Sequence, residues 1–179
     1  MNYLELYEYN GLVRRSFLEA LSKLPWDEVI KNREASFYSI RNIFLHTLEV
    51  EERLIHYFIS GKVSEWSPLE FDNFTDIDRI RVRTYMIDEG TEKILGSLPA
   101  EKLTEFLLFP RRDLPAVRMT VEDVLLQNLT EQVHHRGELI ALLWQLDVEP
   151  PKMGWSFYVN EANKGRMKHR PPTRSSESD

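Results

Sequence analysis

Three residues of this chain have the types and the spacing expected of a metal site: His46, Glu131 and His135. Glu131 and His135 are four positions apart, so in a helix they would lie on one face, one turn from each other. They interrupt an otherwise apolar stripe in residues 121–146, where an unpaired carboxylate would be costly to bury. His46 interrupts a second apolar stripe, in residues 43–57. Imidazole and carboxylate donors suit a divalent metal, so we expect these three residues to hold one ion.

Plainer interpretations of the same residues remain open from sequence alone. A buried histidine is more often hydrogen-bonded than metal-bound, and Glu131 with His135 could form an i,i+4 pair on a solvated face. Glu49, three residues after His46, is a competing carboxylate ligand. His134 points about 100° away from His135 in a helix, which favours a supporting or surface position for it.

A di-iron site of the ferritin type is a separate hypothesis, because residues 131–134 have the form Glu-x-x-His. Such a site needs a second Glu-x-x-His motif on another helix. The nearest candidate, Glu52 with His56, is one residue too long. The sequence therefore argues against a di-iron site.

The elements that would position these residues are four helices, predicted from apolar spacing over residues 3–24, 36–60, 75–98 and 121–147. Ser36 is the expected N-cap of the second helix, and Gly61 is expected to end it. Thr120 and Asp123 are expected to form the capping pair of the fourth helix. Core contacts are expected in the first helix from Leu4, Leu12, Phe17, Leu18 and Leu21.

Helices of this length favour an all-α four-helix bundle. The long connection after residue 60 could form a crossover, and residues 107–119, with two prolines, predict an irregular or short β-hairpin segment. Gly137 falls inside the fourth helix, where close packing against a neighbouring helix would explain it. We expect one bundle domain over residues 1–160 and a flexible basic and polar tail over 161–179.

Composition excludes several classes of function. The chain has no cysteine, so disulfides, thiolate zinc sites and a cysteine nucleophile are absent. The net charge of −6 argues against binding to nucleic acid. The N-terminus does not resemble a signal peptide and no segment is apolar enough to span a membrane, so we expect a cytoplasmic protein.

The last predicted helix carries a recognisable motif, HHRGELIALLWQLDVEPP. It resembles the His-His-Arg-Gly-Gln helix of the DinB-like (YfiT-like) metalloenzyme superfamily. Tyr9-Asn10, the segment SIRNIFLHTLEVEERLIHYF and Pro150-Pro151 agree with this resemblance, which extends over roughly residues 1–155.

The resemblance implies an up-down-down-up bundle, often a homodimer, that binds a divalent metal through three histidines. Two of these positions match His46 and His135, but the third is Glu131, so this chain departs from the three-histidine pattern. Glu138 likewise replaces the glutamine that commonly follows the glycine. Zinc or nickel is the expected metal, with iron or manganese as alternatives.

The resemblance also implies a function: a thiol S-transferase-like enzyme, or a hydrolase, acting on a small molecule. The cosubstrate that the resemblance implies is a low-molecular-weight thiol, and the absence of cysteine fits a reaction in which the thiol is supplied from outside the chain. The alternative is a non-catalytic bundle that stores or senses a metal or serves as a scaffold. A pocket reaching the metal would favour the enzyme, whereas a closed four-ligand site would favour the alternative.

Overall fold

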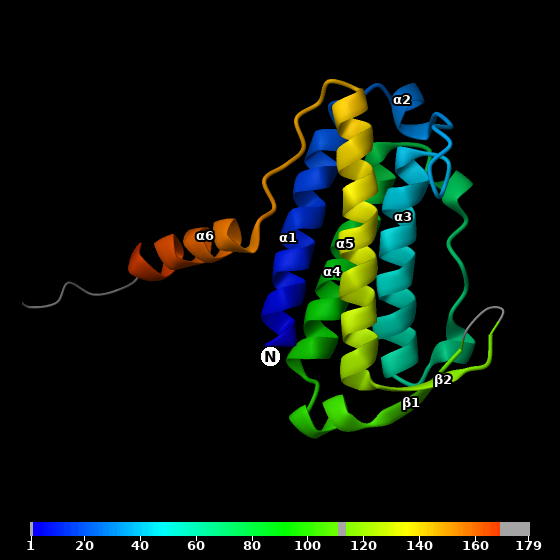
Figure 1. Ribbon diagram of the computed structural model, residues 1–179, viewed down its shortest axis with the longest axis vertical. Coiled ribbons are helices and arrows are strands. Elements are labelled where there is room, and N and C mark those ends of the chain that lie inside the picture. Colours follow the sequence, from blue (N-terminus) through cyan, green and yellow to red (C-terminus); the bar gives the residue numbers. More distant parts are fainter. Residues whose placement is uncertain (1, 111–113, 169–179) are drawn as a thin grey trace, which may run out of the picture.

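The chain forms four long helices that lie side by side, with two short strands at one end of the bundle (Figure 1). The computed structural model describes residues 2–110 and 114–168. The long helices are α1 (Tyr3–Leu21), α3 (Ile40–Glu51) with its continuation η1 (Glu52–Ile59), α4 (Ile77–Gly96) and α5 (Val121–Gln145). α1 and α5 run one way and α3 and α4 the other (Figure 1). The predicted up-down-down-up four-helix bundle is therefore confirmed.

The first predicted helix divides into two. Asn2 caps α1 by accepting a hydrogen bond from the Glu5 amide, 3.3 Å long. α1 then ends at Leu21 instead of the predicted residue 24, and Pro25 precedes the short helix α2 (Trp26–Ile30). Proline disfavours the helical conformation in the residue before it, which explains the break.

The second long helix starts later than predicted. Ser39, not Ser36, is its cap, and the Ser39 hydroxyl accepts a hydrogen bond of 3.2 Å from the Asn42 amide. α3 passes without interruption into η1, whose turns are π-helical. Gly61 has a φ of 72°, a left-handed conformation that glycine adopts without strain, and it ends the helix as predicted.

The connection from η1 to α4 is the predicted crossover. It contains two short 3₁₀ turns, η2 (Val63–Glu65) and η3 (Phe71–Asn73), and runs along the outside of the bundle (Figure 1). It brings the chain back to the end where α3 began. Asp76 then caps α4 by accepting a hydrogen bond of 2.9 Å from the Arg79 amide.

The predicted hairpin lies under the bundle, directly before α5. A 3₁₀ turn, η4 (Ala100–Thr104), leads into β1 (Phe106–Phe109), which pairs antiparallel with β2 (Val117–Thr120). Thr120 and Asp123 form the predicted capping box at the start of α5. β2 thus enters α5 directly, which fixes the position of the helix that carries Glu131 and His135.

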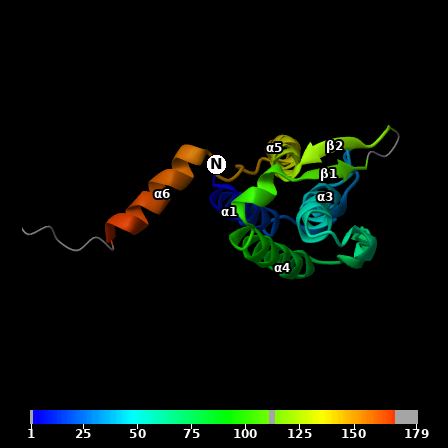
Figure 2. The same cartoon turned by 90° about the horizontal axis from the view of Figure 1, so that it is seen from below.

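Helix α6 (Trp155–Lys168) follows the bundle and projects away from it (Figures 1 and 2). Its first turns are held by Tyr9, whose ring meets those of Trp155 and Tyr158 edge-on at 5.1 and 5.5 Å. Residues 161–168, the first part of the predicted tail, belong to this helix. Residues 169–179, the remainder of that predicted tail, lie outside the described part of the chain. None of the described helices is both long and apolar enough to cross a membrane.

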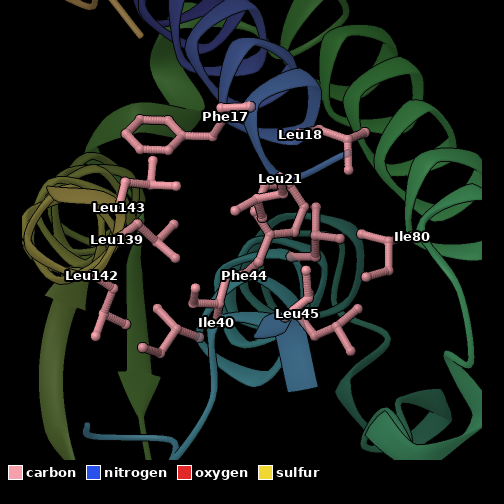
Figure 3. Packing of buried hydrophobic residues seen from close by; sticks show 14 of the residues in the cluster. Phe17, Leu18, Leu21, Ile40, Phe44, Leu45, Ile80, Leu139, Leu142 and Leu143 are labelled. Atoms are coloured by element: carbon pink, nitrogen blue, oxygen red, sulfur yellow. The ribbon is translucent and has the colours of Figure 1, made fainter. Parts of the chain in front are cut away.

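The main apolar core lies between α1, α3, α4 and α5 (Figure 3). Of the core contacts predicted in α1, Phe17, Leu18 and Leu21 are fully buried and Leu4 is half-buried. The prediction for Leu12 was wrong, because its side chain is 39% exposed. The inward face of α1 is instead set by a polar residue, Asn10, together with the positions that follow it at helical spacing.

A buried charged cluster crosses the middle of the bundle and was not predicted. Arg14 of α1 pairs with Glu51 of α3 and, at 3.2 Å, with Asp88 of α4. Asn10 and Thr91 each donate a hydrogen bond of 3.0 Å to the Glu51 carboxylate. These groups tie three helices together at one level, since each buried charge needs a partner on another helix.

The explanation proposed for Gly137 does not hold within this chain. A Cβ atom at Gly137 would meet no heavy atom of the described residues within 4 Å, apart from neighbouring backbone of its own helix. We therefore expect Gly137→Ala to raise the free energy of unfolding by about 1 kcal/mol, the helix-propensity difference. Urea denaturation measures this. Gly90→Ala is the matched control, and it should destabilise because its Cβ would collide with the His56 ring. A destabilised Gly137→Ala variant would contradict the expectation.

Candidate metal centre

The structure brings the three predicted ligands together. His46 comes from α3, and Glu131 and His135 come from the facing side of α5. The donor atoms of the three residues all lie within 4.8 Å of one another. Nε2 of His135 is 3.6 Å from the Glu131 carboxylate, and the two imidazole rings are 4.8 Å apart and nearly perpendicular.

Glu138 fixes the orientation of His135. Its carboxylate lies 2.6 Å from Nδ1 of His135 and accepts a hydrogen bond of 2.9 Å from the Ser36 hydroxyl. Burial raises the pKa of Glu138, but these two hydrogen bonds outweigh it and lower the pKa below its usual value. Nε2 of His135 is therefore left facing Glu131. A carboxylate behind the outer nitrogen is typical of metal-bound histidines.

His46 is held between aromatic and polar neighbours. The ring of Phe37 stacks on it at 3.8 Å, and Glu49 lies 3.9 Å from its Nδ1. Burial, followed by the proximity of His135, lowers the pKa of His46 to about 4. Its imidazole is consequently neutral at neutral pH, which is the form that binds a metal.

The two competing ligands are less well placed. Glu49 accepts a hydrogen bond of 2.9 Å from the Leu69 amide and is in neither group of possible ligands found among the described residues. His134 is in the second such group, with His135 and Glu138, but it is exposed. In that arrangement Glu138 would have to be a ligand instead of the hydrogen-bond partner of His135. The geometry thus favours Glu131 as the third ligand.

A cavity of about 250 Å³ opens beside the three residues. Gln127 donates a hydrogen bond of 2.9 Å to one Glu131 oxygen, while the other faces His135. The cavity is lined by His46, Val50, Arg53, Leu54, Phe109, Gln127 and Glu131. A larger cavity, about 400 Å³, lies at the start of α4, and no imidazole lines it. Of these two cavities, the smaller one is lined by the candidate metal ligands His46 and Glu131.

The donor set fits a divalent metal. Two imidazole nitrogens and one carboxylate oxygen are an established set for catalytic zinc and also occur at non-haem iron. Ligand bonds of about 2.0–2.2 Å require the three donor atoms, which lie within 4.8 Å of one another, to move closer together around the ion. With three donors and an adjoining cavity, such a site keeps coordination positions open.

Sequence reasoning missed the roles of Glu138 and Phe37. Glu138 lies three residues after His135, a spacing that could have identified it as the residue behind the imidazole. Phe37 belongs to an irregular segment before α3, where no periodic pattern indicates which side chains turn inward.

Glu138→Ala should weaken metal binding by about 10- to 100-fold, the usual effect of losing such a supporting carboxylate. Glu138→Gln should weaken it less, because the amide oxygen still accepts from Nδ1 of His135. Competition with a chromogenic chelator measures both affinities. Glu89→Ala, on the exposed side of α4, is the control. Equal affinities for the wild-type protein and Glu138→Ala would remove Glu138 from the site.

Comparison with known proteins supports the resemblance drawn from the motif in α5. The model of the DinB family matches residues 1–168, which includes α6 as well as the bundle. No match was found among curated proteins. The family model covers nearly the whole chain, and the fold is the up-down-down-up bundle with His46, Glu131 and His135 clustered inside it. The chain therefore belongs to the DinB family.

Proposed function

We propose that the protein is a metal-dependent enzyme acting on a small molecule, with one divalent ion held by His46, Glu131 and His135. The observation that carries this proposal is the position of the three donors, which converge from two helices at the wall of a cavity. A closed structural site would instead be surrounded by four protein ligands. The adjoining cavity therefore favours an enzyme over a storage, sensing or scaffold protein.

Thiol transfer is the proposed reaction, with hydrolysis as the second candidate. A divalent ion in this site would lower the pKa of a bound thiol or water and so supply a nucleophile at neutral pH. The thiol must come from a substrate or cosubstrate, since the chain has no cysteine. Zinc or nickel is the proposed metal, on the strength of the family resemblance; iron and manganese are alternatives, since all four metals accept imidazole and carboxylate donors.

The chain's own residues have positioning roles in this proposal. Glu138 holds the tautomer of His135, and Gln127 orients Glu131. Phe37 restricts rotation of His46. The ring of Phe109, from the hairpin, packs edge-on against Phe58 at 5.5 Å and covers one side of the cavity. Such apolar walls limit access of water to a nucleophile.

The test uses tag-free protein loaded with zinc or nickel. Transfer of 2-mercaptoethanol to monobromobimane and hydrolysis of 4-nitrophenyl acetate are followed with metal-loaded protein, metal-free protein and the His135→Ala variant. We expect a metal-dependent rate in at least one assay that His135→Ala loses. Equal rates for all three preparations in both assays would contradict the enzyme proposal and favour a non-catalytic metal protein.

A further inference from the structure

Arg53 lies in the wall of the cavity that adjoins the candidate metal ligands. It belongs to η1, and its guanidinium group is over the ring of Trp66, 5.4 Å from the ring centre. Among the described residues that line this cavity, it is the one cation. Arg53 has no role in the reaction proposed above.

Arg53 differs from most arginines of the bundle in having no carboxylate partner. Arg83 pairs with Glu52, for example, and Arg41 with Asp72 at 2.7 Å. Within residues 2–110 and 114–168, no carboxylate oxygen lies within 4.0 Å of the Arg53 guanidinium nitrogens. The charge of Arg53 does act on Glu49, one turn earlier, whose pKa it lowers against the rise caused by burial, but Glu49 accepts its hydrogen bond from the Leu69 amide. The guanidinium N–H groups of Arg53 are therefore available to a ligand in the cavity.

The position of Arg53 determines how far the anionic group of such a ligand would lie from the metal donors. It follows His46 by seven residues, two helical turns, which separates the two backbones by roughly 10 Å along the axis. The apolar side chains of Val50 and Leu54 line the cavity as well. The charge of Arg53 is close enough to contribute to the lowered pKa of His46. The cavity thus offers metal donors, a short apolar stretch and a cation, within about 250 Å³.

The chemical groups around this cavity indicate the class of substrate that would bind there. A guanidinium group is planar, and its paired N–H donors match the two oxygens of a carboxylate. The Trp66 ring, 5.4 Å away, gives the Arg53 guanidinium an aromatic surface to rest on. The carboxylates of Glu131 and Glu138 would be offset by a divalent ion, so they would not repel an anion at the far side of the cavity. We propose that Arg53 binds the carboxylate of the substrate, and that the protein acts on small molecules with a carboxylate a few bonds from the reacting atom. This inference rests on the proposed function, since it needs the metal at one end of the cavity.

The experiment compares two thiols of similar size with the cobalt(II)-loaded protein. 3-Mercaptopropionate carries a carboxylate, and 3-mercaptopropan-1-ol is its neutral counterpart; thiolate-to-cobalt charge-transfer absorption gives the Kd of each. We expect the wild-type protein to bind the carboxylate at least about tenfold more tightly. Arg53→Met should reduce this ratio to near one, with the cobalt content and the Kd of the alcohol unchanged. Arg53→Lys, which keeps the charge without the planar fork, should give an intermediate ratio.

Arg118→Met is the matched control, because Arg118 also lies over an aromatic ring, Phe106, but does not line the cavity. It should keep the wild-type ratio. Equal Kd values for the two thiols with the wild-type protein, or an unchanged ratio in Arg53→Met, would overturn the inference and leave the metal site intact. Absence of the charge-transfer band with both thiols would overturn thiol transfer as the proposed reaction, and the inference with it; the 4-nitrophenyl acetate assay tests hydrolysis separately.

Discussion

Replacing His135 with alanine is expected to abolish binding of the divalent metal, with a loss of affinity greater than about 100-fold, since losing a supporting group alone costs about 10- to 100-fold. His135 is 4% exposed, its Nε2 faces Glu131, and its Nδ1 is held by Glu138. His134, the adjacent imidazole on α5, is exposed and is not grouped with His46 and Glu131. His46→Ala should have a similar effect, because it removes the donor from α3.

Elemental analysis of tag-free protein, followed by chelator competition, measures this effect. Near one metal per chain is expected for the wild-type protein, and none for His135→Ala, His46→Ala or Glu131→Ala. His134→Ala is the matched control, because His134 neighbours His135 on the same helix but is exposed. Metal retained in Glu131→Ala and lost in His134→Ala would move the ion to the group formed by His134, His135 and Glu138. A wild-type protein that binds no zinc, nickel or manganese would contradict the metal site altogether.

The grouping of the candidate ligands could be predicted from sequence because it depends on local helical geometry. Glu131 and His135 are one turn apart within an apolar stripe, so their shared direction follows from the 3.6-residue repeat. The position of His46 required only that two mid-helix residues of neighbouring helices face each other. Arg53 could not be assigned in this way, because its place in the cavity depends on where the hairpin and the crossover lie.

The order and direction of the helices were predicted, but the polar interior was not. Sequence patterns treat charged side chains as exposed, and for most residues this is correct. Arg14, Glu51 and Asp88 are exceptions, since each can be buried only because the other two lie opposite it on different helices. Their mutual compensation is a tertiary property that a single helix does not reveal. Leu12 was misplaced for the same reason, because the inward face of α1 follows Asn10 and Arg14.

The consequence of this buried cluster is a second large effect, on stability. Arg14→Met keeps the length of the side chain but leaves the Glu51 carboxylate, in a residue 1% exposed, without its cation. Removing one partner of a buried ion pair typically costs about 3–5 kcal/mol, and we expect a loss of this size in the free energy of unfolding. Urea denaturation at pH 7 measures it. Arg81→Met, which removes more exposed ion pairs with Asp78 and Glu19, should cost less than about 1 kcal/mol.

The loss in Arg14→Met should also depend on pH. Burial raises the pKa of the Glu51 carboxyl group even with Arg14 beside it, and without Arg14 the pKa should rise further. The folded variant would then bind more protons than the unfolded chain above the ordinary pKa of glutamate, so its stability should fall as pH rises. The deficit relative to wild type should therefore be smaller at pH 5 than at pH 8. A deficit that is independent of pH would mean that Glu51 finds another partner in the variant.

Arg14→Met combined with Glu51→Leu should recover part of the stability, because the uncompensated charge is then removed from the core.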